Sequence, residues 1–150
     1  MVSRVVSGGQ TGVDRAALDA ALALGVPCGG WCPRGRRAED GRIDIRYPLQ
    51  ETPSRDYAER TEWNVRDSDG TLILTRGVPH GGTALTLEIA RRLGRPALVL
   101  DLATVRDTRA VRDWLAREGI RILNVAGPRE SAAPGIHPDA LALLQIVLAP

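Results

Sequence analysis

The chain has 150 residues, of which 43% are hydrophobic and 25% charged, the size and composition of one globular domain. All 20 basic residues are arginine, so the classes that need a lysine are excluded: Walker A phosphate loops, protein kinases and pyridoxal-dependent enzymes. The formal net charge of +2 is too small for a surface that binds duplex nucleic acid. Nucleic acid is therefore not expected as a partner.

The sequence has no apolar run near the roughly 18 to 20 residues that a membrane span requires, and residues 1–4 lack a signal-peptide core. We therefore expect a cytoplasmic protein without a membrane partner. Cys28 and Cys32 are separated by three residues, without a second pair of metal ligands, and His80 and His137 are far apart in sequence. No metal site is predicted, and the two cysteines are expected to be reduced thiols.

Strand and helix patterns alternate along the chain. Apolar runs predict strands at 2–6, 27–31, 71–74, 97–100 and 120–125, and helical spacing predicts helices at 13–24, 57–67, 84–93, 108–118 and 139–148. The charged segment 33–47 predicts a long loop that binds a ligand or is mobile. Together these elements indicate an α/β fold in one domain over residues 1–150, a Rossmann-like three-layer sandwich with a mainly parallel sheet of about five strands and helices on both faces.

A glycine-rich turn joins the first strand to the first helix. Glycine lets the backbone lie close to a ligand, and the first amides of a helix attract anions. The alternative is an ordinary tight turn in which Thr11 caps the helix with Asp14 as its partner. Because the spacing GGxxG differs from GxGxxG, an ordinary nicotinamide dehydrogenase is disfavoured. The predicted phosphate-binding residues of this turn are Gly8, Gly9, Gln10, Thr11 and Gly12.

A second glycine-rich turn, residues 77–83, follows the strand at 71–74, and a third, residues 127–131, follows the fifth strand. In open parallel sheets the ligand binds where the carboxyl ends of the strands meet. Two such turns therefore indicate an anionic-ligand site, in which Gly81, Gly82 and Thr83 would hold a second polar group.

Three arginines of the long loop, Arg34, Arg36 and Arg37, have forked guanidinium groups that would close over an anion. For each of them a solvated charged face is an equal alternative. Trp31 and Trp63 would stack on a flat heterocycle or belong to the core.

Four stretches carry a resemblance to a known family: SGGQTGVDRAALDAAL (7–22), GGWCPRGRRAEDGRI (29–43), YPLQETPSRDYAERTEWNVRDSDGTLIL (47–74) and GGTALTLEIARRLGRP (81–96). They resemble the "putative molybdenum carrier" family, the circularly permuted YpsA-like branch of the Rossmann-like group related to the LOG nucleotide-processing proteins. The resemblance implies a small-molecule phosphorylated ligand, either a nucleotide or a pterin such as molybdenum cofactor, and a homo-oligomer.

The LOG-type proteins carry the motif PGGxGTxxE, whose glutamate acts in cleaving the base from a nucleoside monophosphate. Gly81, Gly82 and Glu88 match this motif, but Ala84 and Leu85 stand where it has Gly and Thr. The leading hypothesis is therefore a binding protein, a carrier or sensor of a phosphate-bearing nucleotide or molybdopterin-type cofactor. The alternative is a LOG-like phosphoribohydrolase of nucleoside monophosphates, with Glu88 as its catalytic residue; in the first case Glu88 would pair with Arg91 or Arg92.

Overall fold

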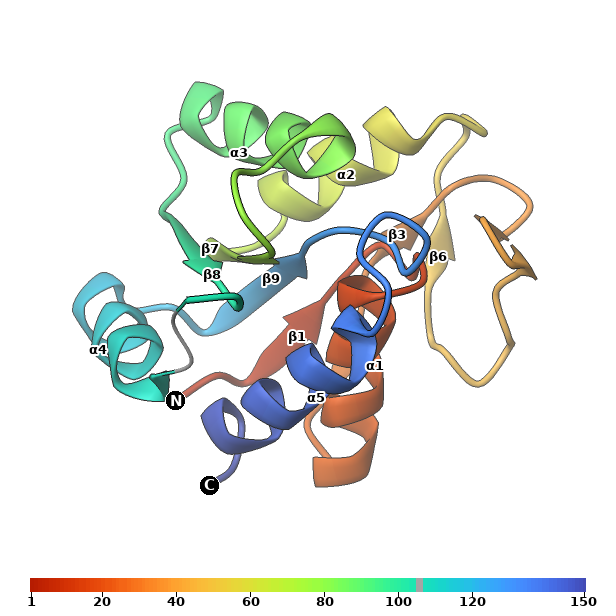
Figure 1. The fold of residues 1–150 in the computed structure, drawn as a ribbon. Coiled ribbons are helices and arrows are strands. Elements are labelled where there is room, and N and C mark those ends of the chain that lie inside the picture. Colours follow the sequence, from red (N-terminus) through yellow and green to blue (C-terminus); the bar gives the residue numbers. More distant parts are fainter. Residues whose placement is uncertain (105–106) are drawn as a thin grey trace.

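The structure is a computed structural model that describes residues 1–104 and 107–150 (Figure 1). Five of the strands form one sheet, and four shorter strands form two small ribbons beside it. The strands are β1 (Arg4–Val6), β2 (Cys28–Gly29), β3 (Trp31–Cys32), β4 (Arg37–Ala38), β5 (Gly41–Arg42), β6 (Gln50–Glu51), β7 (Gly70–Thr75), β8 (Ala97–Asp101) and β9 (Ile122–Ala126). The helices are α1 (Val13–Leu24), α2 (Tyr57–Arg66), α3 (Gly81–Arg92), α4 (Thr108–Glu118) and α5 (Ile136–Val147).

The central sheet has the order β2-β1-β9-β7-β8, and every neighbouring pair is parallel. If β9 is counted as strand 1, and β1, β2, β7 and β8 follow as strands 2 to 5, this order becomes 3-2-1-4-5. That is the strand order of the dinucleotide-binding fold, in which the ligand crevice lies where the order reverses, between strands 1 and 4. In this chain the reversal falls between β9 and β7.

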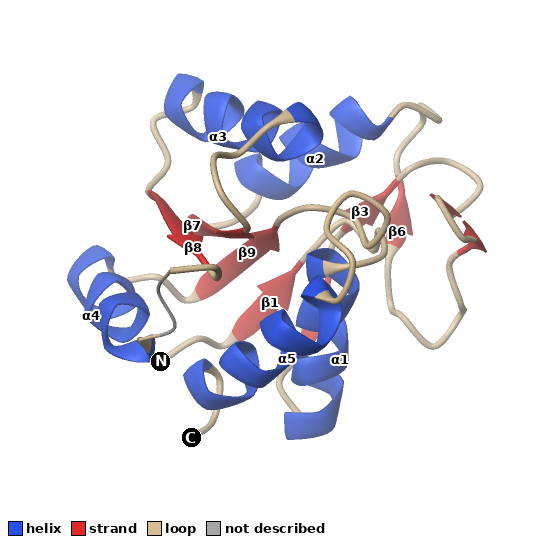
Figure 2. Ribbon diagram, viewed as in Figure 1, coloured by secondary structure: helices blue, strands red, loops and turns tan. Residues whose placement is uncertain are grey.

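Helices cover both faces of the sheet, as Figure 2 shows. On one face, α1, α4 and α5 pack against alternate strand residues such as Val5, Leu72 and Leu123 in the main aliphatic core. On the other face, α2 and α3 bury Val65 and Ile89 in a smaller cluster. The predicted fold class, a parallel five-strand sheet between two helical layers, is thus confirmed.

The long segment between β3 and α2 is not a plain loop. It contains the β4–β5 hairpin and the short β6 strand, which pairs with β3. Its apolar side chains Ile43, Tyr47 and Leu49 pack with Leu18 of α1. None of the helices in the described part of the chain is long and apolar enough to cross a membrane.

Two helices begin three residues earlier than their sequence patterns predict. Helix α3 begins at Gly81 rather than Ala84, and α5 begins at Ile136 rather than Asp139. The first amides of a helix have no intrahelical acceptor, so a first turn tolerates glycine and also Pro138, which lacks an N–H. Because α3 starts early, Gly81, Gly82 and Thr83 of the second glycine turn belong to the first turn of the helix.

Candidate functional site

A cavity of about 310 Å³ lies at the carboxyl ends of β1, β7 and β9, under the amino ends of α2 and α3. It therefore sits at the reversal of strand order, where this topology binds ligands. Its polar lining comes from the turn after β1 (Gly8, Gln10, Asp14), from α2 (Tyr57, Arg60, Thr61, Asn64), from the start of α3 (His80, Gly81, Gly82, Thr83, Thr86) and from β9 and its loop (Asn124, Gly127, Arg129).

The first glycine turn directs its amides at its own side chains. The N–H of Gln10 donates to Oδ2 of Asp14 at 3.3 Å, and the N–H of Thr11 donates to Oε1 of Gln10 at 3.0 Å. The N–H of Gly9 donates to Oγ of Ser7 at 3.4 Å. The amides that the sequence predicts as a phosphate cradle thus already have internal acceptors, one of which is the carboxylate of Asp14.

Asp14 is 7% exposed, and burial raises its pKa from 3.8 to about 6. The charge of Arg60 and the backbone N–H groups of Gln10 and Gly8 act in the opposite direction on this pKa. Burial is the larger effect, so the site partly disfavours the charged form of Asp14.

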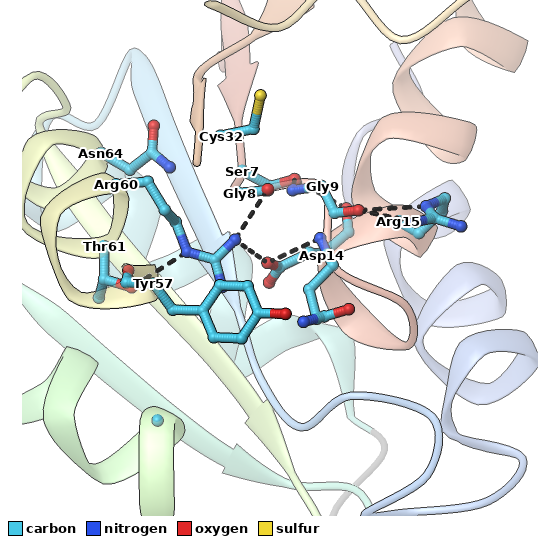
Figure 3. Close-up of polar contacts among 12 residues, drawn as sticks. Ser7, Gly8, Gly9, Asp14, Arg15, Cys32, Tyr57, Arg60, Thr61 and Asn64 are labelled. Atoms are coloured by element: carbon cyan, nitrogen blue, oxygen red, sulfur yellow. Dashed lines mark hydrogen bonds and ion pairs between the residues drawn. The ribbon is translucent and has the colours of Figure 1, made fainter. Parts of the chain in front are cut away.

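Arg60 reaches across from α2 to the first turn, as Figure 3 shows. Its Nη1 donates to the carbonyl oxygen of Gly8 at 2.8 Å and lies 3.8 Å from Oδ2 of Asp14, while Nε donates to Oγ1 of Thr61. The guanidinium also lies 5.1 Å from the centre of the Tyr57 ring. Nη2 has no hydrogen-bond partner among the described residues, so one cationic donor of the cavity lining remains available.

The start of α3 presents free amides to the same cavity. The amides of Thr83 and Ala84 donate to the carbonyl oxygen of His80, but those of Gly81 and Gly82 have no acceptor within the described ranges. Thr83 is 6% exposed, and its hydroxyl makes no hydrogen bond to any described residue. A hydroxyl without a described partner and two open amides therefore stand together at the positive end of a 12-residue helix.

Helix α3 differs from the other helices that follow strands of the sheet. An internal carboxylate lies at the start of each of those. Asp107 accepts from the N–H of Arg109 at α4, and Glu130 accepts from the N–H groups of Gly135 and His137 at α5. At α1, Asp14 of the first turn accepts from the N–H of Gln10, just before the helix. At α3 the N-cap is His80, without a side-chain cap bond, and the first turn has no acidic residue. Of these four helix ends in the described chain, α3 is the one that lacks an internal anion.

Several predicted site residues lie away from the cavity. The guanidinium of Arg36 donates to the carbonyl oxygens of Ile43, Asp44, Tyr47 and Leu49 inside the long segment. Arg37 stacks over Tyr57 at 4.7 Å and donates to the carbonyl of Arg55, and Arg34 is exposed. The structure does not bring these three arginines to the cavity, although Arg37 touches an aromatic ring that lines it.

Three residues of the first glycine turn serve its packing. Gly9 and Gly12 have φ values of 78° and 79°, and a Cβ at Gly12 would lie under 3.0 Å from the carbonyl oxygen of Pro128. The Thr11 hydroxyl donates to Glu39, which also accepts from the N–H and hydroxyl of Ser131. Of the five residues predicted here, Gly8 and Gln10 line the cavity.

Glu88 is exposed on α3 and does not line the cavity. Its expected partner Arg92 instead pairs with Glu62 of α2 at 2.9 Å. Trp31 and Trp63 contact each other edge to face at 4.8 Å, outside the cavity. Burial raises the pKa of Cys28 and of Cys32, which favours the neutral thiols, and neither cysteine lines the cavity.

Sequence reasoning missed Arg60 and Asn124, which line the cavity from α2 and β9. The Asn124 side chain donates to the hydroxyl of Thr71 on the neighbouring strand, at 3.2 Å and buried. A polar residue inside an apolar strand pattern was a usable signal for Asn124. For Arg60 there was none, because it contacts Gly8 across 52 residues of sequence.

Taken together, the sheet order and the position of the cavity define a permuted Rossmann-like protein with a cavity at its strand-order reversal. The chain belongs to the family described as "Circularly permutated YpsA SLOG family", whose model matches residues 5–148. The permutation agrees with the strand order, which becomes 3-2-1-4-5 when counted from β9.

The chain is also similar to a solved structure, the crystal structure of "Putative molybdenum carrier protein" from Syntrophus aciditrophicus SB. The two share 46% sequence identity over 99% of this chain and 96% of that one, with a TM-score of 0.97. No curated protein matches the chain.

Proposed function

We propose that this chain is one Rossmann-like ligand-binding domain that acts as a carrier or sensor of a phosphate-bearing nucleotide or molybdopterin-type cofactor. The observation that carries the proposal is the start of α3, where the amides of Gly81 and Gly82 and the hydroxyl of Thr83 are open to the cavity. A phosphate there would receive the kind of hydrogen bonds that carboxylates receive at the starts of α4 and α5. Nη2 of Arg60 is a further donor for it.

The size and chemistry of the cavity support an organic ligand. A volume of about 310 Å³ lies within the range of small-molecule sites. No group of three or more His, Cys, Asp or Glu residues that would hold a metal ion occurs among the described residues. A molybdopterin-type ligand would therefore be held by its pterin and phosphate, with the metal as cargo.

The hydrolase alternative lacks a supporting contact. Glu88, its predicted catalytic residue, is exposed and outside the cavity, so it would not reach a glycosidic bond of a ligand held there. We therefore propose binding without turnover. The resemblance to molybdenum carriers also leads us to propose a homo-oligomer, which light scattering after size-exclusion chromatography would check.

The test of the proposed function is the identity and location of the bound ligand. Native mass spectrometry of the purified protein would identify what co-purifies, and melting shifts would be measured with adenosine, guanosine and pterin monophosphates. The variant Gly82→Asp places a carboxylate at the start of α3, where a glycine Cβ position is in open space. We expect it to fold and to lose the melting shift.

Glu88→Gln is the matched control, because it changes an acidic residue on the same helix outside the cavity. It should keep the wild-type shift. Absence of a shift with every phosphorylated ligand would overturn the proposal. Release of free base from a monophosphate, lost in Glu88→Gln, would replace it with the hydrolase.

A further inference from the structure

Asp14 is the only carboxylate among the described residues that line the cavity. It accepts a hydrogen bond from the N–H of Gln10 and lies 3.8 Å from the guanidinium of Arg60. A carboxylate has about four lone-pair positions, so these partners leave room for further donors. A ligand group that faces Asp14 is therefore a hydrogen-bond donor, since a second anion would be repelled.

Gln10 supplies the opposite kind of group beside Asp14. Its Oε1 accepts from the N–H of Thr11 at 3.0 Å and from the N–H of Glu39 at 2.9 Å, which fixes the orientation of the side-chain amide. The remaining Nε2 is a donor and has no partner among the described residues. Gln10 is 6% exposed and lines the cavity, so this donor is open to an acceptor on a ligand.

The donor–acceptor pair lies at the opposite side of the cavity from the start of α3. Asp14 and Gln10 follow β1, α3 follows β7, and β9 separates these two strands. Strands in a sheet lie about 4.8 Å apart, so the ends of the two strands that carry these parts of the site are about 10 Å apart. That span suits a ligand with a phosphate at one end and a flat ring at the other.

We propose that the cavity selects a ring with the 2-amino-4-oxopyrimidine edge, in which a carbonyl, a ring N–H and an amino group stand side by side. The carbonyl accepts from Nε2 of Gln10, and the N–H and amino group donate to the carboxylate of Asp14. This edge is common to guanine and to pterins, and is absent from adenine and hypoxanthine. The inference rests on the proposed function and names the class of its ligand.

The experiment compares pairs of ligands that differ in the amino group. Calorimetric affinities would be measured for guanosine monophosphate against inosine monophosphate, and for 6-hydroxymethylpterin phosphate against the corresponding 2-oxo lumazine. A site built to accept hydrogen bonds rejects a ligand that lacks the donor. We expect each amino ligand to bind at least about tenfold more tightly than its partner, and the tighter of the two amino ligands identifies the source of the ring.

Two variants separate recognition from folding. Within each pair, Asp14→Asn should bring the ratio of the affinity for the amino ligand to that for its partner to about one. The reason is that the amide presents one acceptor in place of two. Gln10→Glu keeps Oε1 for Thr11 and Glu39 but removes the donor, and should weaken both guanosine and inosine monophosphate. Thermal unfolding would establish that each variant folds.

The outcomes also distinguish this inference from the proposed function. Equal affinities within each pair, or a ratio that Asp14→Asn leaves unchanged, would overturn the inference while the carrier proposal stands. Binding of adenosine monophosphate as tightly as guanosine monophosphate would do the same. No binding of any of the five ligands would overturn both.

Discussion

Nη1 of Arg60 lies 3.8 Å from Oδ2 of Asp14, and the side chains of both residues are 10% exposed. The distance is too long for a strong charge-assisted hydrogen bond, which joins atoms at about 2.8 Å. The attraction therefore offsets only part of the cost of burying the carboxylate, and the pKa of Asp14 stays raised, at about 6. An unfavourably buried acid that a ligand could satisfy is typical of a binding site.

The first prediction concerns the pH dependence of stability. Because the pKa of Asp14 is raised from 3.8 to about 6 on folding, its contribution to stability is fully present below pH 3.8 and is lost as the pH rises through 6. The free energy of unfolding of the wild type, minus that of Asp14→Asn, should fall by up to about 3 kcal/mol between pH 3.5 and 8.

Urea unfolding of both proteins across this range measures the difference. Glu39, Asp40 and Asp67 have lowered pKa values and favour folding at higher pH, but their effect is common to both proteins and cancels. Parallel pH profiles for the two proteins would contradict the prediction.

The second prediction concerns Arg60. Arg60→Leu removes the cation beside Asp14 and the donor to the carbonyl of Gly8, which leaves a buried carboxylate without its counter-charge. We expect a loss of roughly 3 kcal/mol in the free energy of unfolding at pH 7.5. The loss should be smaller at pH 5, where Asp14 is largely protonated.

Arg66→Leu is the matched control, since Arg66 lies on the same helix and pairs with Asp67 at an exposed position. It should change the free energy of unfolding by less than about 1 kcal/mol. Equal losses in the two variants, or a loss at Arg60 that does not depend on pH, would show that Asp14 and Arg60 are not coupled.

The strand and helix order was predictable because the periodicities are strong and local. Helix α4, for example, has the predicted bounds Thr108–Glu118, with an N-cap at Asp107 and a left-handed glycine at its end, Gly119. The starts of α3 and α5 were predicted late because glycine and proline lower helix propensity in the interior but not in the first turn.

The position of the cavity was predictable from the glycine turns, but not the partners of its polar groups. A turn with free amides looks the same in sequence whether a ligand or Asp14 faces those amides. Likewise, the charge of the segment 33–47 does not reveal that Arg36 turns inward to backbone carbonyls. These contacts depend on tertiary structure, which residue patterns over a few positions do not encode.

The third prediction compares two glycines with similar positive φ values. Gly12 has a φ of 79° and packs against the carbonyl of Pro128, whereas Gly77 has a φ of 73° and open space around its Cβ position. Gly77→Ala should cost about 1 kcal/mol, from the positive φ alone. Gly12→Ala should cost roughly 3 kcal/mol or more, because overpacking adds to the strain of a backbone with φ 79° and ψ −128°.

Chemical denaturation of both variants measures these losses. Equal costs would mean that the turn after β1 moves away from the loop after β9 without resistance, which would contradict the close packing of the two turns at the cavity.

The fourth prediction distinguishes a structural arginine from a ligand-binding one. Arg36 donates to four backbone carbonyls, and a lysine offers one nitrogen that cannot reach all of them. Arg36→Lys should lower the free energy of unfolding by about 2 kcal/mol or more, because buried acceptors lose their donors. The matched change Arg34→Lys, at an exposed position, should lie within about 0.5 kcal/mol of the wild type.

Ligand affinity completes this comparison, measured below the melting temperature of each variant. Since Arg36 does not line the cavity, folded Arg36→Lys should bind guanosine monophosphate as the wild type does, whereas Arg60→Lys should bind it more weakly because Nη2 is lost. The opposite result, wild-type stability with lost binding in Arg36→Lys, would move the anion site from the start of α3 to the long segment. The arginines would then close over the ligand, as their sequence pattern first suggested.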